Sequence, residues 1–407
     1  MTDDRRSTLR VAAALALATA VSLGLARFSY ALLLPPMRAD LGWSYLTAGA
    51  MNTVNASGYL LGALLAPVWL RRFHARPVLV WSSVLTGLLL AAHGVVQSDA
   101  ALYALRLLTG CASAGTFVGG GLLAARLASR GSAPPGLVLG IYYGGAGIGI
   151  IASAVLVPPL SALPVPHAWQ AAWIGLGVAG GLAAGVTARA TRRWSDDAST
   201  SGPPEPFPLR PFAAGLAAYL CFGLGYIGYM TFILTLLREQ AHGTAFVATF
   251  FAVLGAGTVV SSWLWAGLLQ RHRGGVPLAL LNGLLALATV VPVVSDHAVA
   301  VFASGALFGS VFLSVVASTT ALVRHNAPPG AWPRGIAAFT ITFAAGQIVG
   351  PSLTGWVADG PWGLRGGLAA SAGVLLVAVV LALGQRPRVQ AVGAGGAGEG
   401  TRGGTAR

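Results

Sequence analysis

The sequence is poor in charge, lacks lysine altogether and holds only two cysteines. Charged residues make up 9% of its 407 residues, whereas a soluble globular protein carries roughly 25%, so a water-soluble domain is excluded. Cys111 and Cys221 lie in separate apolar segments, which excludes a disulfide framework or a cysteine-rich metal site. Arginine supplies all 25 basic residues, and the net charge is +14. Such a balance is compatible with a nucleic-acid partner, but the arginines cluster in short loops, and we expect no such partner.

Long apolar runs fill most of the chain, from residue 9 to residue 384. About 20 such residues cross a bilayer as a helix, whereas the strands of a membrane β-barrel alternate apolar and polar residues over about ten positions. The first run, Leu9 to Pro35, exceeds the apolar core of about 7–15 residues in a signal peptide, so we interpret it as a retained span. The pattern predicts an all-α polytopic membrane protein.

Twelve transmembrane helices are predicted, and a polar, proline-rich stretch divides them six and six. The predicted spans cover residues 9–36, 46–70, 77–97, 100–129, 135–158, 168–190, 211–237, 243–270, 276–294, 298–325, 334–357 and 363–384. We expect an N-terminal six-helix bundle at 1–190, a cytoplasmic interdomain loop at 191–210 and a C-terminal six-helix bundle at 211–385. The glycine-rich end, 386–407, is expected to be a disordered cytoplasmic tail.

The placement of arginine predicts the orientation of the chain in the membrane. Twenty of the 25 arginines fall in termini and loops on one side of the predicted spans, and three, Arg38, Arg238 and Arg365, fall on the other. Cytoplasmic loops carry the excess of positive charge, so both termini are expected in the cytoplasm. The expected location is the inner (plasma) membrane of a bacterial cell. Arg27 and Arg106 belong to neither side, because they lie within spans.

An internal repeat relates the two predicted halves. One ungapped offset of 199 residues keeps spans 1 to 5 in step with spans 7 to 11. The pairs that coincide include Gly24 with Gly223, Tyr30 with Tyr229, Asp40 with Glu239, Gly58 with Gly257, Gly110 with Gly309 and Gly147 with Gly346. The repeat predicts two pseudo-symmetric six-helix bundles in parallel orientation.

The repeat and several motifs resemble the major facilitator superfamily (MFS) of transporters over nearly the whole chain. The segments "RFSYALLLPPM", "GYLLGALLA" and "GAGIGI" are similar to the YbfB/YjiJ-like branch of that superfamily. The resemblance implies a secondary transporter without a cofactor or metal, whose central cavity is lined by spans 1 and 4. Substrate sites in such folds lie near the bilayer midplane, where the repeats meet.

Three segments bear on the mechanism that the resemblance implies. "RLLTG", Arg106 to Gly110, is similar to the motif whose arginine is linked to proton coupling in drug exporters. "PVWLRRFHAR", Pro67 to Arg76, stands where the superfamily has a gating loop with an acid and bases, but the acid is missing. Arg71, Arg72 and the repeat-related Arg271 are therefore candidate gating residues. "GIYYGGAGIG" lacks the glycine–proline pair of antiporters, which weakens a proton-antiport interpretation.

Arg27 and Arg106 are the leading candidates for substrate binding. Both are expected in the outer half of the membrane, roughly 14 Å and 9 Å from the ends of their spans at 1.5 Å per residue. A charge at that depth costs about 2.5 kcal/mol or more, yet every acidic residue lies in a terminus, a loop or a span end. The pair therefore predicts an anionic substrate, held by forked guanidinium groups. Alternatively, both groups bind backbone carbonyls, or Arg27 extends toward the interface.

Further polar residues of the spans are candidate cavity residues, with helix packing as the alternative. Substrate-binding candidates are Tyr30, Asn52, Asn55, Gln347 and Tyr229, and the outer acids Asp40 and Glu239 are candidates for gating. Tyr30 shares a helix face with Arg27, and Asn52 and Asn55 share another. The ridge that begins at Gly58 equally favours close helix packing.

The sequence thus predicts a monomeric secondary transporter that moves a small solute, with an organic anion as the leading class, by alternating access. A proton-coupled multidrug exporter is the alternative, and a sensor without transport ranks third. An enzyme is not expected, because no loop carries a catalytic or phosphate-binding arrangement. The coupling partner stays open between protons and a counter-anion, because arginine does not titrate in the useful range.

Overall fold

The computed structural model describes residues 3–192 and 205–387. Within these ranges the regular secondary structure is entirely helical, and twelve helices are long and apolar enough to cross a membrane. The all-α fold and the twelve spans are thereby confirmed, and the predicted ends differ from the observed ones by no more than five residues. Much of the predicted interdomain loop (193–204) and nearly all of the predicted tail (388–407) lie outside the described residues.

The first six spans form the N-terminal bundle. Its elements are α1 (Asp3–Thr19), η1 (Ala20–Phe28), α2 (Tyr30–Leu41), α3 (Tyr45–Phe73), α4 (Ala75–Ala92), η2 (His93–Val95), α5 (Asp99–Arg130), α6 (Pro135–Ser161) and α7 (Trp169–Ala190). Serine caps the start of two of these helices. The Oγ atoms of Ser44 and Ser98 accept hydrogen bonds from N–H groups in the first turns of α3 and α5. Such caps satisfy donors that have no partner inside a helix.

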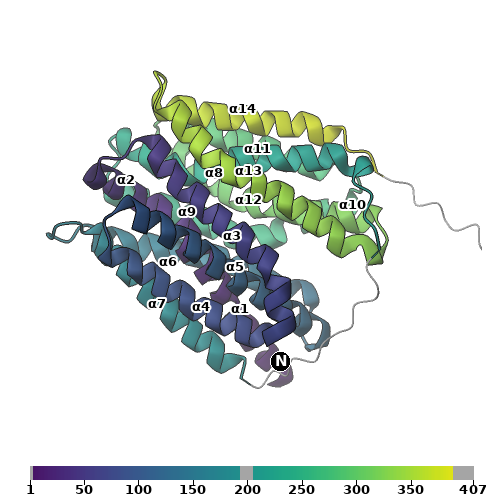
Figure 1. Cartoon of the computed structure of the whole chain (residues 1–407). Coiled ribbons are helices and arrows are strands. Elements are labelled where there is room, and N and C mark those ends of the chain that lie inside the picture. Colours follow the sequence, from purple (N-terminus) through teal and green to yellow (C-terminus); the bar gives the residue numbers. More distant parts are fainter. Residues whose placement is uncertain (1–2, 193–204, 388–407) are drawn as a thin grey trace, which may run out of the picture.

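The last six spans form the C-terminal bundle. Its elements are η3 (Arg210–Phe212), α8 (Ala213–Glu239), α9 (Thr244–Leu264), α10 (Ala266–Arg271), α11 (Val276–Val294), α12 (Ala298–Asn326), η4 (Pro329–Ala331), α13 (Trp332–Ala358) and α14 (Gly363–Leu383). In Figure 1 the purple and blue helices of the N-terminal bundle lie beside the green and yellow helices of the C-terminal bundle.

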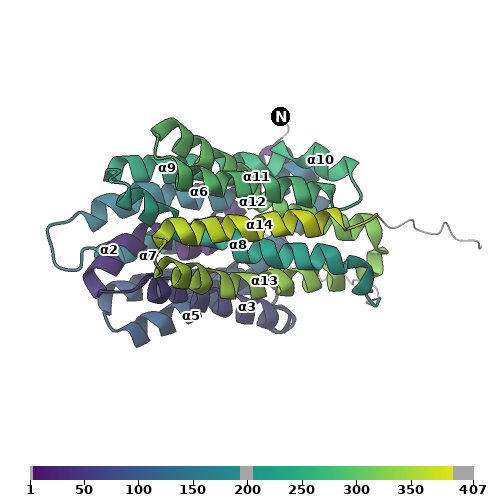
Figure 2. The same cartoon turned by 90° about the horizontal axis from the view of Figure 1, so that it is seen from above.

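The helices of both bundles run between two ends of the molecule. We call the end with the chain's beginning and the last residues of α14 the N-terminal end, and the opposite end, with the loops 42–44, 162–168, 240–243 and 359–362, the distal end. The N-terminal end lies toward the right in Figures 1 and 2, and α2 marks the distal end at the left. The predicted orientation, which stays a prediction, would make the distal end extracellular.

Close contacts between helices reproduce the internal repeat in three dimensions. A Cβ atom at Gly110 of α5 would lie 2.1 Å from the carbonyl oxygen of Asn55 in α3. The counterparts at the offset of 199 behave alike, because a Cβ atom at Gly309 of α12 would lie 2.0 Å from the carbonyl oxygen of Leu254 in α9. Glycine lets membrane helices approach to backbone contact, and the same crossing is built once in each bundle.

The first span is interrupted by a π-helix at its middle, a feature that the sequence analysis did not predict. Residues Ala20–Phe28 form this segment, all nine are buried, and the N–H of Ser29 reaches the carbonyl oxygen of Gly24 at 2.9 Å. Gly24 lies against Gly149 of α6, where a Cβ atom would come within 2.4 Å of the Gly149 Cα. π-Helical turns are rare and concentrate at functional sites, and this one carries Arg27.

Candidate functional site

Arg27 lies between the two bundles and binds a side chain of the opposite bundle. Only 4% of its surface is exposed, and its Nη2 donates a hydrogen bond of 2.6 Å to Oε1 of Gln347, 320 residues later in the chain. Its Cζ lies 5.4 Å from the ring centroid of Tyr59. The Nε has no hydrogen-bond partner among the described residues, so the guanidinium keeps a free donor in a buried place.

Gln347 extends the contact of Arg27 into the C-terminal bundle. Its Nε2 donates to the hydroxyl of Tyr226 on α8, and Gln347 itself is buried on α13. Arg27, Gln347 and Tyr226 therefore form one chain of hydrogen bonds from the π-helix to α8. Gln347 was among the predicted substrate-binding residues, but the sequence did not predict that Arg27 would be its partner.

Arg106 is fully buried, and its guanidinium binds groups of the N-terminal bundle. Nη1 donates to the carbonyl oxygen of Ala26 at 3.0 Å, Nη2 to Oδ1 of Asn52 at 3.2 Å and Nε to the carbonyl oxygen of Met51 at 3.5 Å. The ring of Tyr30 lies beneath it, with the centroid 4.8 Å from Cζ. These contacts match the alternative interpretation of Arg106, in which it binds backbone carbonyls, and they tie the π-helix to α3.

The remaining polar candidates fall into two groups. Asn52 crosses between the bundles, because its Nδ2 donates to Oγ1 of Thr231 at 2.8 Å. Asn55 and Tyr30 stay inside the N-terminal bundle, where Nδ2 of Asn55 donates to the Arg106 carbonyl at 3.1 Å and the Tyr30 hydroxyl to the Ala48 carbonyl at 2.9 Å.

Tyr229 lies inside the C-terminal bundle. Its hydroxyl is 2.7 Å from Oγ of Ser304, and its ring stacks on Phe308 with centroids 4.0 Å apart. The structure therefore brings Arg27, Gln347 and Asn52 to the interface, where Asn52 also binds Arg106 from within the N-terminal bundle. It places Tyr229 within a single bundle.

The buried charge of this region is entirely positive. Arg27 and Arg106 are the buried arginines of the described chain. Every acidic residue whose side chain the structure describes is exposed, namely Asp4, Asp40, Asp99, Glu205, Glu239, Asp296 and Asp359. Burying a charge without a counter-charge is costly, and among the described residues the two guanidinium groups have only neutral hydrogen-bond partners.

Aromatic side chains flank Arg27 on both sides. In the N-terminal bundle, Phe117 of α5 lies 6.4 Å from Tyr59 and 6.2 Å from Tyr143 of α6, between ring centroids. In the C-terminal bundle, Tyr226 packs 5.6 Å from Phe343 and 6.1 Å from Phe312. The latter cluster was not predicted, although Tyr219, Phe222 and Tyr226 follow one another at helical intervals of three and four.

A cavity of about 460 Å³ lies between the bundles on the distal side. It is lined from α2 by Pro35 and Pro36, from α6 by Pro158 and from α8 and α9 by Arg238 and Thr244. Nη2 of Arg238 donates to Oγ1 of Thr244 at 2.8 Å. Arg27 precedes this cavity on the same span, so the cavity lies between Arg27 and the distal end.

At the distal end, the C-terminal bundle caps a helix of the N-terminal bundle. The two carboxylate oxygens of Asp359 accept hydrogen bonds from the N–H groups of Tyr45 and Leu46 at 2.8 and 2.9 Å. The Tyr45 hydroxyl donates to Glu239, and the Arg38 guanidinium lies over the Tyr45 ring at 3.7 Å from its centroid. We call these residues the distal latch. The sequence did not predict Asp359 as a gating residue, because its partners Tyr45 and Leu46 lie more than 300 residues away in the chain.

The other proposed gating residues differ in their surroundings. Asp40 stays within the N-terminal bundle, where Oδ2 accepts from Nε1 of Trp169 at 2.6 Å and lies 2.5 Å from Nδ1 of His167. Arg71, Arg72 and Arg271 are exposed at the N-terminal end. Of the acids proposed for gating, only Glu239 makes a contact between the bundles in the described chain.

Three comparisons with known proteins bear on this arrangement. A family model described as "Uncharacterised MFS-type transporter YbfB" matches residues 19–383. A "Chloramphenicol resistance protein" from Streptomyces lividans is 28% identical over 391 residues, which cover 90% of this chain and 93% of that protein.

Solved structures share the fold. The nucleoside transporter NupG has a TM-score of 0.71 at 13% identity and covers 94% of this chain and 99% of its own. A bacterial homologue of the human lysosomal transporter Spinster, in an inward-facing and unoccupied conformation, has a TM-score of 0.70 at 16% identity and covers 95% and 98%. The chain belongs to the YbfB family of MFS-type transporters, multi-pass membrane proteins of twelve spans.

Proposed function

We propose that this protein is a secondary transporter that moves a small aromatic organic anion across the plasma membrane by alternating access. The observation that carries the proposal is the buried positive charge of Arg27 and Arg106 without any buried acid in the described chain. An anionic solute would supply the missing charge each time it binds between the bundles.

Arg27 is proposed to contact the solute, and Arg106 is proposed to hold the π-helix that carries Arg27 in position. Arg27 keeps its Nε unpartnered and bonds across the interface to Gln347. Arg106 donates hydrogen bonds to Ala26, Met51 and Asn52. The bond to Ala26 holds the π-helix in place. A planar guanidinium favours a carboxylate or phosphate, to which it can donate two parallel hydrogen bonds.

The aromatic clusters support a solute with a ring. In one bundle Tyr59 lies beside Arg27 and packs on Phe117. In the other, Tyr226 is linked to Arg27 through Gln347 and packs on Phe343. Aromatic groups favour offset-stacked and edge-to-face neighbours at centroid distances of about 4.5–7 Å. A flat ring with an acidic substituent would fit both kinds of contact at once.

The contacts between the bundles support alternating access. The distal latch holds the bundles together at one end, and the bonds from Arg27 to Gln347 and from Asn52 to Thr231 hold them at mid-depth. A solute that takes over donors of Arg27 would compete with the Gln347 contact. Binding would thus change the balance between two arrangements of the bundles, as population shift requires.

Coupling to a counter-anion agrees better with these residues than coupling to protons does. The described spans bury no carboxylate that could carry a proton. His93, the buried histidine of the N-terminal bundle, stacks on Trp173 at a centroid distance of 4.4 Å, and its Nδ1 lies 2.7 Å from the Leu89 carbonyl. Its ring is thus enclosed by core packing rather than placed beside Arg27.

Export of an aromatic drug is the second candidate function. The relative from Streptomyces lividans is described as a chloramphenicol resistance protein, and the aromatic clusters around Arg27 suit a neutral aromatic solute as well as an anionic one. In that case Gln347 and Arg27 would donate hydrogen bonds to a neutral solute, and the charge of Arg27 would not be needed to bind it.

The test is a binding screen on the purified protein, in which aromatic carboxylates and chloramphenicol are compared by thermal stabilisation and by uptake into proteoliposomes. Arg27→Gln should weaken binding of the carboxylate by at least tenfold, because a hydrogen bond to a charged group contributes about 1.5–3 kcal/mol. The control is Arg365→Gln, which removes an exposed arginine near the distal end.

Equal carboxylate binding by wild type and Arg27→Gln would refute the anion site. Stabilisation by chloramphenicol alone, with resistance upon expression in a sensitive host, would instead support the second candidate. Uptake that accelerates when a second organic anion is loaded on the opposite side would support exchange with a counter-anion.

A further inference from the structure

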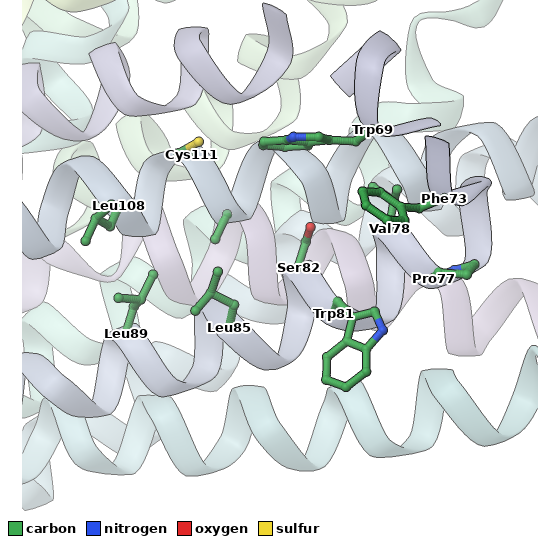
Figure 3. A pocket seen from close by; sticks show the side chains of 11 residues that line it. Trp69, Phe73, Pro77, Val78, Trp81, Ser82, Leu85, Leu89, Leu108 and Cys111 are labelled. Atoms are coloured by element: carbon green, nitrogen blue, oxygen red, sulfur yellow. The ribbon is translucent and has the colours of Figure 1, made fainter. Parts of the chain in front are cut away.

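An apolar groove opens on the membrane-facing side of the N-terminal bundle, away from Arg27. Its volume is about 520 Å³, and Figure 3 shows side chains of α3, α4 and α5 around it. The lining includes Trp69, Phe73, Trp81, Leu85, Leu89 and Leu108. Trp81 exposes 73% of its surface, and in a helix that spans the membrane such a side chain meets lipid.

The groove spans one leaflet of the bilayer. On α4 it extends from Pro77, in the first turn at the N-terminal end, to Leu89. These twelve steps of 1.5 Å correspond to about 18 Å, and one half of a hydrocarbon core of roughly 30 Å is about 15 Å. A single acyl chain in the leaflet at the N-terminal end would therefore lie along its whole length.

Positive charge marks the end of the groove that would meet the lipid head group. Arg71 and Arg72 form the last turn of α3 next to Phe73 and are exposed. The Arg72 Cζ lies 5.8 Å from the ring centroid of Phe73, which lines the groove. The segment Pro67 to Arg76 contains no acid, so no carboxylate of this segment competes for the two guanidinium groups.

We propose that this groove is a binding site for an anionic phospholipid. Its acyl chain lies against Trp81, Leu85 and Leu89, and its phosphate binds Arg71 and Arg72. Arginine suits the phosphate because its fork donates parallel hydrogen bonds, and basic residues beside spans attract anionic head groups. The site is separate from the interface that holds Arg27, so it does not depend on the proposed transport function.

The test uses tryptophan fluorescence of the purified full chain in neutral detergent. Phosphatidylglycerol with brominated acyl chains is titrated in, and bromine quenches nearby tryptophan. Quenching should saturate and should be reduced in Trp81→Phe, because Trp81 lies in the groove. Unlabelled phosphatidylglycerol should displace the probe, whereas phosphatidylcholine and inorganic phosphate should not.

The double variant Arg71→Gln/Arg72→Gln should bind the brominated lipid roughly 30-fold more weakly, which converts to about 2 kcal/mol, as expected for two arginines near an anionic head group. The matched control is Arg271→Gln/Arg273→Gln, which removes two exposed arginines, one at the end of α10 and one in the loop after it. Equal displacement by phosphatidylcholine, displacement by inorganic phosphate, or equal weakening by both double variants would overturn the proposal. The proposal would also be overturned if wild type showed no quenching. Equal quenching in wild type and Trp81→Phe would overturn it as well.

Discussion

Asp359→Ala is expected to weaken the closed distal end of the protein. The carboxylate of Asp359 binds the first two N–H groups of α3, at Tyr45 and Leu46. Ser44 satisfies the next one, at Thr47, from within the N-terminal bundle. Three of the donors that a helix leaves open at its beginning are thus shared between a local cap and a residue of the other bundle.

The expected size of the effect follows from this geometry. Loss of a helix cap costs about 1 kcal/mol, and a carboxylate at a helix N-terminus contributes roughly 0.3–1 kcal/mol. Asp359 is exposed, so water replaces part of the interaction, and we expect about 1 kcal/mol in total, or a factor of about five in the population of distal-open molecules. Asp359→Asn should give a smaller shift, because an amide oxygen still accepts one hydrogen bond.

Distances between spin labels on the two bundles provide the measurement. Gln97 and His297 are exposed in distal loops of the N-terminal and C-terminal bundles, and cysteines at these positions can be labelled in a background without Cys111 and Cys221. The longer distance should gain population in Asp359→Ala. Asp296→Ala is the control. A distance distribution that matches wild type, or that Asp296→Ala changes equally, would refute the role of the distal latch.

Three further predictions concern the packing and the interface. Arg106→Met should lower the free energy of unfolding by about 1–3 kcal/mol, because three buried acceptors lose their donor; a detergent thermal-shift assay that gives a wild-type midpoint would contradict the positioning role. Gly58→Ala should lower the same midpoint, because its Cβ would lie 2.0 Å from the Leu107 carbonyl oxygen and overpacking costs roughly 1–3 kcal/mol, whereas Gly181→Ala, with no atom within 4 Å, should not. Gln347→Leu should reduce transport without loss of expression, because it leaves Arg27 without its partner; unchanged transport at equal protein levels would argue against the bridge.

The sequence predicted the membrane helices well, because each is encoded locally. An apolar run of about 20 residues forms a helix in lipid whatever its neighbours are, since every backbone group must be satisfied within the segment. The same logic identified Arg27 and Arg106, because a charge in an apolar run is conspicuous. The repeat was also visible in the sequence, because Gly110 and Gly309 coincide at the offset of 199. In the structure the two glycines make equivalent contacts.

The partners of these residues were not predictable in the same way. Arg27 meets Gln347 from 320 positions away, and Tyr45 meets Asp359 from 314. Arg106 was a leading substrate-binding candidate together with Arg27, yet it binds the carbonyl of Ala26, beside Arg27 in the π-helix. These pairings depend on how two bundles dock and on a local change of helix type.

The sequence by itself determined the fold class, the twelve spans and the presence of two cations within the spans, because hydrophobic length and charge act segment by segment. Only the tertiary structure decided which guanidinium keeps a free donor, which acid caps a helix of the other bundle and where aromatic rings gather around Arg27. The physical reason is that a hydrogen bond needs both partners within about 3 Å, and helix docking, rather than position along the chain, sets that distance.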